Sequence, residues 1–394
     1  MSRGQATHLL TAMGPEITTW SVDPGNCTIK PGSTVTAPQK VHYLWPNRTG
    51  RMVYVACSNI SPRMENPENP EHFLAAYRVD PKSGALTLHQ APIALPYRPV
   101  HLTVDVQNEH VIVAYPHPDA ITVHRLAADG GLGDVVAQPP DLDLGIYVHQ
   151  VRVTPSGKSV IVVTRGNNAE EGKPEDPGAL KVFGYDKGVL SNAASIAPDG
   201  GYGFGPRHID FDPRGRWIYA SLERQNLLHV FGLQDDKLSP APLHVSTTLG
   251  QPQRPGYQLV GTVHVHPNGC EVYVANRAHG KTSHEGKSVF DACENSIAVF
   301  RINAATGEPR LVQNAWTHGQ HVRCFSIDPS GRMLVAGNMT SMTVRDHGGG
   351  THEEPSNLSI FRIGEDGLLE FVSRIPVESA TERMFWLGMV ATDL

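Results

Sequence analysis

A repeated β motif constrains the fold of this chain more than any other feature of the sequence. The clearest copies are HIDFDPRGRWIYASLERQ with NLLHVFGL, from His208, and VHVHPNGCEVYVANRAHG with NSIAVFRI, whose second part starts at Asn295. The same template fits four further segments, so repeat units begin near residues 42, 101, 149, 208, 264 and 325. A period of about 48 to 61 residues fits propeller blades or other all-β units of three or four strands.

Each unit reads as a strand, a Pro-x-Gly turn, a β-branched strand, a loop, an alternating strand and a weaker final strand. The second-strand runs VIVAY, VIVVT and VYVAN are continuously apolar, which indicates strands buried on both faces between stacked sheets. The 38 glycines and 31 prolines supply many turns and argue against long helices. The pattern therefore favours a propeller over an open sandwich.

The two chain ends are predicted to complete the ring. MFWLGMV, from Met384, has the character of a lone first strand, and LLTAMG, EITTWSVD and CTIKPGSTV match the second, third and fourth strands of a unit. Joining them removes two open sheet edges, which invite aggregation. We therefore predict an all-β fold: one seven-bladed β-propeller domain over residues 1–394, closed by N- and C-terminal strands that share one blade.

Composition and charge exclude several classes of protein. A net charge of −6 without any basic run argues against nucleic-acid binding. There is no apolar stretch of roughly 18 or more residues and no apolar core of a signal peptide before Gly14, so we expect neither membrane contact nor secretion. The five cysteines form no C-x-x-C pair, which is typical of reduced thiols. The sequence thus predicts a cytoplasmic protein.

The register of the repeat brings ionisable residues to one end of the ring. Six residues before the turn prolines of three units stand His149, Arg207 and Arg323, and ten residues after the turn prolines stand Arg165, Glu223 and Arg277. In an antiparallel hairpin the first strand starts beside the end of the second, so both sets are predicted at the same mouth of the central channel.

Four arginines that face a water-filled channel would repel one another, so they indicate an anionic ligand. We expect a small anion to lodge among Arg165, Arg207 and Arg277. Two other interpretations stay open at this point. The arginines and the glutamate form structural pairs in a wet channel, or the propeller is a non-catalytic platform that binds a protein partner.

Long insertions are predicted to surround the same mouth as a lid or rim. Residues 60–72, 166–178, 278–294 and 340–356 each follow the second strand of their unit. Rim histidines are numerous but lack H-E-x-x-H or comparable spacing, so we predict no metal site and no cofactor. They are His279, His284, His318, His321, His347 and His352. His208, beside Arg207, is predicted to point into the core by strand alternation.

Four segments of the chain resemble the seven-bladed lactonase family, which includes the propeller-type 6-phosphogluconolactonase and the fungal 3-carboxy-cis,cis-muconate lactonizing enzyme. They are Gly205-Pro206-Arg207-His208 with its Asp-Pro-x-Gly-Arg turn, His149-Gln150, Tyr273-Val274-Ala275-Asn276-Arg277, and Val322-Arg323-Cys324-Phe325-Ser326-Ile327-Asp328-Pro329. The resemblance runs from about residue 40 to 390 and implies a catalytic set of His149, Arg207, Glu223 and Arg277.

The sequence also departs from that family. Thr164-Arg165-Gly166 stands where many members carry Asp-Leu-Gly, and Leu222 replaces an asparagine that often precedes the family glutamate. A basic residue has thus replaced an acidic one, which points to a different substrate from that of either named enzyme. We expect Arg165, Arg323, Gln150 and Asn276 to bind substrate.

The resemblance implies lactone chemistry on a small anionic substrate. Opening a lactone needs an activated water, a donor for the oxyanion and an acid for the leaving alkoxide. As a hypothesis, Glu223 activates water, His149 protonates the leaving oxygen, and Arg207 and Arg277 stabilise the oxyanion and hold the substrate. Hydrolysis of a sugar-acid lactone is the first expectation. The alternative is a cycloisomerase that closes a carboxymuconate to a muconolactone, and a homo-oligomer is compatible with either.

Overall fold

The computed structural model describes residues 5–60, 67–251, 256–291, 293–339, 341–345, 348–377 and 382–393. Within these ranges the regular structure consists of β-strands and one short 3₁₀ turn, η1 (Pro198–Gly201). None of the described residues belongs to a helix long and apolar enough to cross a membrane.

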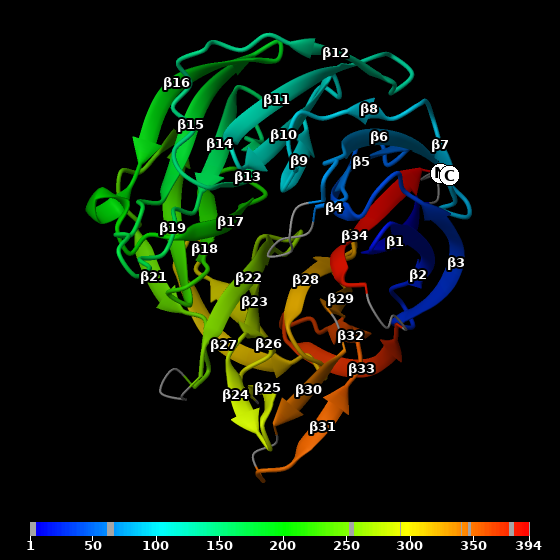
Figure 1. Cartoon of the computed structure of the whole chain (residues 1–394), viewed down its shortest axis with the longest axis vertical. Helices are drawn as coiled ribbons and strands as arrows, with labels where there is room; N and C mark the ends of the chain where they lie inside the picture. Colours follow the sequence, from blue (N-terminus) through cyan, green and yellow to red (C-terminus); the bar gives the residue numbers. More distant parts are fainter. Residues whose placement is uncertain are drawn as a thin grey trace.

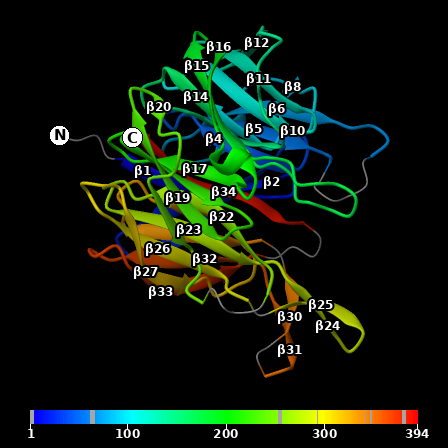
Figure 2. The same ribbon diagram turned by 90° about the vertical axis from the view of Figure 1, so that its left-hand side faces the viewer.

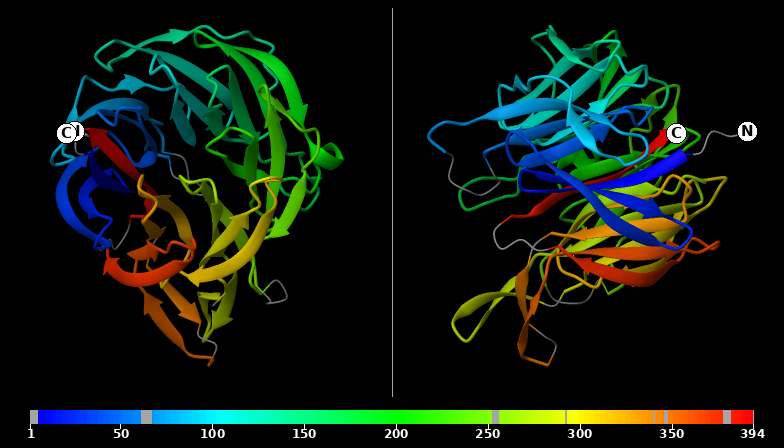
Figure 3. Two further views of the ribbon diagram at one scale, coloured as in Figure 1. Left: turned by 180° about the vertical axis from the view of Figure 1, so that it is seen from behind. Right: turned by 90° about the vertical axis from the view of Figure 1, so that its right-hand side faces the viewer.

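Seven antiparallel sheets stand like blades around a central channel, so the all-β propeller prediction is confirmed (Figures 1 and 3). Each blade is named below by its innermost strand. The first three internal blades are, from the inside outward, β4 (Val41–Pro46), β5 (Met52–Ser58), β6 (His72–Val79) and β7 (Leu86–Leu88), with β8 (Ile93–Ala94) also on β6; β9 (His101–Val104), β10 (His110–Pro116), β11 (Asp119–Leu126) and β12 (Leu132–Val136); and β13 (Val148–Val153), β14 (Ser159–Thr164), β15 (Ala179–Asp186) and β16 (Val189–Ile196).

Three more internal blades follow along the chain. They are β17 (Pro206–Phe211), β18 (Trp217–Leu222), β19 (Leu227–Gln234) and β20 (Lys237–Leu238), with β21 (His244–Thr247) also on β19; β22 (Gln258–Val265), β23 (Glu271–Ala278), β26 (Ser296–Ile302) and β27 (Pro309–Trp316); and β28 (Val322–Ile327), β29 (Met333–Asn338), β32 (Asn357–Ile363) and β33 (Leu369–Pro376).

The seventh blade is built from both chain ends, as the sequence predicts. Its inner strand is β34 (Met384–Asp393), followed outward by β1 (Gln5–Met13), β2 (Glu16–Asp23) and β3 (Thr28–Thr36). The antiparallel register of β1 and β34 runs from the Gln5–Asp393 pair to the Met13–Met384 pair. The first and last strands therefore lie side by side (Figure 1), and the ring closes through a sheet.

Burial follows the repeat. Every residue of β10, β14 and β23 is buried, because each second strand lies between two neighbouring blades. A tyrosine recurs on these strands, and its hydroxyl donates to a glycine carbonyl in the next blade. The pairs are Tyr54–Gly130 (3.0 Å), Tyr219–Gly307 (3.1 Å) and Tyr273–Gly367 (2.8 Å). Each bond satisfies a buried polar group and ties two blades together.

A β-bulge recurs where the inner strand begins. The register with the second strand shifts between Val41 and Tyr43, Val148 and Gln150, Pro206 and His208, and Val322 and Cys324. The extra residue in each case is His42, His149, Arg207 or Arg323. Bulges re-aim side chains at the rims of barrels and beside functional sites. Here they turn one residue per blade towards the channel, which positions the site described below.

Two of the four predicted rim insertions are strands and not loops. The segments after β23 and β29 form the hairpins β24 (Lys281–His284) with β25 (Lys287–Asp291) and β30 (Met342–Arg345) with β31 (Thr351–Glu354). These hairpins join through a parallel pairing of β25 with β30 into one sheet, which extends away from the ring (Figure 2). The side chains of Val289, Met342 and Val344 are buried in it.

Candidate active site

A cavity of about 440 Å³ lies at the mouth, defined here as the end of the channel where the inner strands begin and the second strands end. The register argument named six residues for this position: His149, Arg165, Arg207, Glu223, Arg277 and Arg323. All six line the cavity, so the prediction that they share one mouth is confirmed. In the described part of the chain, seven arginines and one carboxylate, that of Glu223, line it. The cavity is therefore strongly cationic.

Glu223 binds three arginines from three consecutive blades. Its Oε2 accepts a hydrogen bond from Nη1 of Arg165 at 2.5 Å, and its Oε1 lies 3.0 Å from Nε of Arg207 and 2.5 Å from Nη2 of Arg277. The side chains of Glu223, Arg207 and Arg277 are buried, whereas that of Arg165 is 23% exposed. We call Arg165, Arg207 and Arg277 the paired trio.

The paired trio keeps Glu223 ionised. Burial alone would raise the pKa of this carboxyl, but Arg277, Arg165 and Arg207 together hold it well below its ordinary value. The main chain fixes its place as well, because the Glu223 N–H donates to Gly205 O at 3.0 Å and Val260 N–H donates to Glu223 O at 2.8 Å. Glu223 is thus a permanent negative charge with both oxygens bound by guanidinium groups.

The cationic surroundings affect the neighbouring groups. The pKa of Arg207 is lowered to about 9, because burial and then Arg277 oppose its charge. Burial and then Arg207 also hold the pKa of His149 well below its ordinary value, so this imidazole is neutral near pH 7. His149 is therefore a neutral group, and its buried Nδ1 has no hydrogen-bond partner among the described residues.

The ring of Tyr147 contacts both His149 and Arg165, the most exposed arginine of the paired trio. The ring of Tyr147 lies almost parallel to that of His149, with centroids 6.4 Å apart and an interplanar angle of 16°. The guanidinium carbon of Arg165 lies 4.0 Å from the centroid of the same tyrosine ring. This cation–π contact restricts Arg165, the most exposed of the three arginines.

Arg98 and Arg323 contrast with the paired trio. Arg98 lies in the segment that leads into β9, and Arg323 is the bulge residue of β28; both are half-buried and line the cavity. Neither guanidinium has a hydrogen bond or an ion pair with any residue that the structure describes. The guanidinium carbon of Arg323 lies 4.1 Å from the centroid of the Phe385 ring, a cation–π contact. We call these two residues the unpaired pair.

Sequence reasoning missed several lining residues besides Arg98. The cavity is also lined by His42, His117, Tyr147, Arg224, Tyr257, Arg383 and Phe385, and by two rim histidines that the sequence did name, His279 and His321. His42 is the bulge residue of its blade, as His149 is. It stands eight residues before Gly50, as His149 does before Gly157, so counting from the turn glycine and not from the proline could have revealed it. Arg224 follows Glu223, and its Nη2 donates to the backbone oxygens of Arg165 and Gly166 at 3.3 and 3.0 Å. Arg224 thus supports the paired trio from outside.

Two residues predicted to bind substrate do not line the cavity. Gln150 is buried, and its Oε1 accepts a hydrogen bond from the Ile209 N–H of the next blade at 2.7 Å. Asn276 is fully buried, and its side-chain nitrogen donates to Thr248 O at 2.7 Å. Strand alternation turns both away from the mouth, although each is adjacent in sequence to a residue that faces it. Their contacts are structural, so the structure does not bring these two side chains to the cavity with the other predicted site residues.

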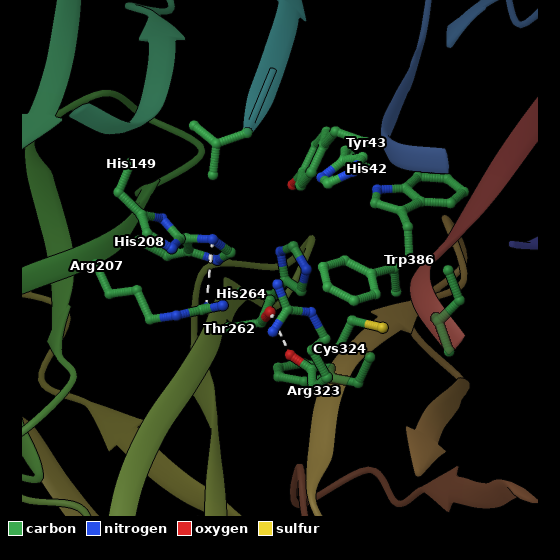
Figure 4. A pocket seen from close by; sticks show the side chains of 14 residues that line it. His42, Tyr43, His149, Arg207, His208, Thr262, His264, Arg323, Cys324 and Trp386 are labelled. Atoms are coloured by element: carbon green, nitrogen blue, oxygen red, sulfur yellow. Dashed lines mark hydrogen bonds between the residues drawn. The ribbon is translucent and has the colours of Figure 1, made fainter. Parts of the chain in front are cut away.

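The prediction that His208 points into the core was wrong. The bulge at Arg207 breaks the alternation, so His208 and Arg207 both line a second cavity of about 40 Å³ deeper in the channel (Figure 4). Arg207 Nη1 lies 3.3 Å from His208 Nε2. Figure 4 shows His149, Arg207 and His208 reaching this cavity from one side and His42, Tyr43 and Trp386 from the other. The cavity is just large enough for a few water molecules.

Among the described residues, no three histidine, cysteine, aspartate or glutamate side chains are grouped so that they could hold a metal ion. Of the rim histidines considered in the sequence, His279 and His321 line the cavity, with ring centroids 5.2 Å apart. His347 lies outside the described residues.

Comparison with known proteins agrees with the fold and with the resemblance. Residues 4–346 match the family model described as "Lactonase, 7-bladed beta-propeller". A 6-phosphogluconolactonase of Bacillus subtilis (strain 168) is 30% identical over 277 residues, which are 67% of this chain and 70% of that protein. A 6-phosphogluconolactonase of Klebsiella pneumoniae is 23% identical over 377 residues, which are 95% of this chain and 96% of that one.

A solved structure supports the same architecture. The periplasmic gluconolactonase of Pseudomonas aeruginosa superposes with a TM-score of 0.71 at 19% identity, over 98% of this chain and 99% of that chain. At this level of identity the superposition speaks for the fold alone. The match of the family model over most of the sequence goes further: the chain belongs to the seven-bladed β-propeller lactonase family.

Proposed function

We propose that this protein hydrolyses the lactone of a sugar acid that carries an anionic group, as the name 6-phosphogluconolactonase of its relatives suggests. The observation that supports this most is that one cavity holds both a neutral histidine and a cluster of arginines. Among the described residues that line it, Glu223 carries the one carboxylate, and both of its oxygens are already bound by arginines. Such a cavity attracts an anionic substrate and offers a proton acceptor beside it.

The surroundings of Glu223 favour a different division of roles from the one expected from the sequence. A carboxylate held by three arginines is a weak base, because proton uptake would cost it all three ion pairs. Glu223 is better suited to neutralise and orient the trio. The water-activating role then falls to His149, which is neutral and has a nitrogen without a partner.

In the reaction we propose, His149 takes a proton from a water molecule while the water oxygen attacks the lactone carbonyl carbon. Arg207 and Arg277 stabilise the negative charge that develops on the carbonyl oxygen. The bond from the carbonyl carbon to the ring oxygen then breaks, and the imidazolium of His149 returns its proton to the leaving alkoxide, the acid role already expected from the sequence. The product is a hydroxy acid that loses its carboxyl proton to solvent.

Hydrolysis is favoured over lactonisation, because the relatives described above are named as lactone hydrolases. Closing a carboxymuconate remains the alternative from the sequence, and no contact in the cavity favours it. The protein-binding platform is the least favoured interpretation, since the mouth is lined by arginines and histidines and not by an apolar surface.

Location and assembly stay predictions. The five cysteines are free in the structure, and the cysteine pattern is typical of reduced thiols and a cytoplasmic protein. The structural neighbour in Pseudomonas aeruginosa, in contrast, is named as periplasmic. Homo-oligomer formation rests on no described contact.

The proposed function is tested by turnover of a phosphorylated sugar lactone, corrected for spontaneous hydrolysis, and by loss of diene absorbance with a carboxymuconate. We expect turnover of the lactone, and we expect His149→Asn to lower kcat by about 10²- to 10⁴-fold with little change in KM. Turnover of the carboxymuconate alone would replace the proposal with the cycloisomerase, and a wild-type kcat for His149→Asn would refute the role of this histidine.

A further inference from the structure

We propose that the unpaired pair, Arg98 and Arg323, forms an anion subsite that binds the phosphate group of a phosphorylated lactone, apart from the carbonyl-binding paired trio. This inference rests on the proposed function, which it extends by naming the residues that select phosphorylated substrates. It goes beyond the expectation from the sequence that an anion lodges among Arg165, Arg207 and Arg277.

The two sets of arginines lie on different arcs of the ring. Arg165, Glu223 with Arg207, and Arg277 come from the consecutive β13, β17 and β22 blades. The remaining blades follow around the channel in the order β28, β34, β4 and β9 (Figure 1). Arg323 lies on β28, Phe385 on β34 and His42 on β4, and Arg98 comes just before β9. A ligand in the cavity of about 440 Å³ can therefore contact both arcs at once.

The charge balance of the two arcs differs. The trio already has a counter-ion, because both oxygens of Glu223 are engaged by its three guanidinium groups. The unpaired pair has no carboxylate partner among the residues that the structure describes. Burial lowers the pKa of Arg98, and burial followed by Arg277 lowers the pKa of Arg323 to about 10. Both arginines therefore stay charged near pH 7, although their surroundings disfavour the positive charge. An incoming anion relieves this cost most at the unpaired pair.

His42 lines the same cavity as the two arginines, and both act on its pKa. It is buried, donates from Nε2 to Ile60 O at 2.9 Å, and has its pKa lowered to about 3 by burial, Arg98 and, to a smaller extent, Arg323. Because a carbonyl only accepts, Nε2 carries the proton, and the ring is neutral. His42 therefore adds no positive charge to the pair and supplies no counter-ion that would compete with a ligand.

The available donors suit a phosphate. The Arg323 guanidinium lies over the Phe385 ring, and none of its N–H groups has a hydrogen-bond acceptor among the described residues, so they are available to a ligand. Two guanidinium groups offer several such donors to the three terminal oxygens of a phosphate monoester. Charge-assisted hydrogen bonds of this kind are stronger than hydrogen bonds between neutral groups. A lactone without phosphate leaves both arginines without an anion, so the subsite discriminates between the two substrates.

The test compares kcat/KM for 6-phosphogluconolactone and for unphosphorylated gluconolactone in Arg98→Gln, Arg323→Gln and the double variant. Each single change should lower kcat/KM for the phosphorylated lactone by about 10- to 100-fold, mainly through KM, and leave the unphosphorylated lactone within about 3-fold. Arg214→Gln is the matched control, because Arg214 is exposed in the turn between β17 and β18 at the far end of the channel. It should change neither value.

Inorganic phosphate gives an independent measurement by calorimetry. The double variant should lose phosphate binding at unchanged Tm, since removal of two unpartnered charges breaks no ion pair, whereas the control should bind as the wild type does. Equal losses on both lactones, or phosphate binding that survives in the double variant, would overturn the subsite. If no lactone is turned over at all, the proposed function fails, and the calorimetric comparison alone still decides whether the pair binds phosphate.

Discussion

The two arcs of the mouth use the same residue type under opposite conditions. In the paired trio the chain supplies its own counter-ion, so Arg165, Arg207 and Arg277 are held in place by Glu223 before any substrate arrives. In the unpaired pair the chain supplies none among its described residues, and the charges of Arg98 and Arg323 are left for a ligand to neutralise. Under the proposed function, this difference assigns the trio to chemistry and the pair to substrate recognition.

The largest effect is expected from removing the internal counter-ion. Glu223→Gln leaves three arginines with no carboxylate partner, so unfolding free energy should fall by about 3–5 kcal/mol and kcat/KM by at least about 100-fold. Urea unfolding and lactone turnover measure the two effects, and phosphate should stabilise this variant more than the wild type.

A different outcome for Glu223→Gln would reverse the comparison. Wild-type stability with complete loss of turnover would mean that Glu223 is the base, as first expected from the sequence, and that the trio does not depend on its charge. Glu223→Asp keeps the charge at a shorter reach and should recover most of the stability.

The next largest effect tests whether the arginines of the paired trio set the pKa of His149. Because a protonated imidazole cannot accept a proton, kcat/KM should fall as pH drops through the pKa of His149, which lies below 6.5. After burial, Arg207 is the main group that lowers this pKa, so Arg207→Gln should move the acid limb of the pH profile upward and lower kcat/KM by about 10²- to 10³-fold. Arg98→Gln should leave the limb close to its wild-type position, and equal shifts in both variants would contradict the division of the mouth.

A smaller effect separates residues that line the mouth from their sequence neighbours. Gln150→Ala removes the acceptor of the Ile209 N–H without touching the cavity, so stability should fall by about 1–3 kcal/mol while kcat/KM stays within about 2-fold. Thermal unfolding and turnover of the same sample check this. If kcat/KM falls by more than the loss of stability accounts for, Gln150 contributes to the site after all.

An effect on stability alone, visible only as pH falls, concerns His42, the neutral histidine on the arc of Arg98 and Arg323. The folded-state pKa of His42 is about 3, below its unfolded value of 6.5, so the unfolded chain binds more protons as pH falls. This contribution to stability is complete above pH 6.5 and is lost below it by about 1.4 kcal/mol per pH unit. His42→Asn should flatten the decline of unfolding free energy between pH 6.5 and 5, whereas an unchanged slope would mean that His42 is charged in the fold.

The repeat made much of the fold predictable. Pro-x-Gly turns and apolar second strands located the six internal blades, and the strand from Met384 with the N-terminal strands located the seventh. Both signals come from short stretches of sequence that recur in the repeat units. Counting from the turn prolines also brought His149, Arg207 and Glu223 to one mouth. Offsets within a hairpin are set by hydrogen-bonded pairing, and a repeat displays that pairing several times.

The remainder depended on features that periodicity does not encode. Bulges at the inner strands break the alternation that the interpretation of His208 relied on, and they show only in the pairing register. Arg98 precedes its strand and has no place in the repeat. The engagement of both Glu223 oxygens, on which its newly proposed role rests, arises from side chains of three different blades.

The most direct measurement is a crystal structure with a bound phosphorylated sugar acid, the product of the proposed reaction. We predict that its phosphate contacts Arg98 and Arg323, that its carboxylate lies against Arg207 and Arg277 beside His149, and that Glu223 keeps its ion pairs. A phosphate bound by Arg165, Arg207 and Arg277, with Arg98 and Arg323 in contact with solvent only, would contradict the division of the mouth into a catalytic and a recognition arc.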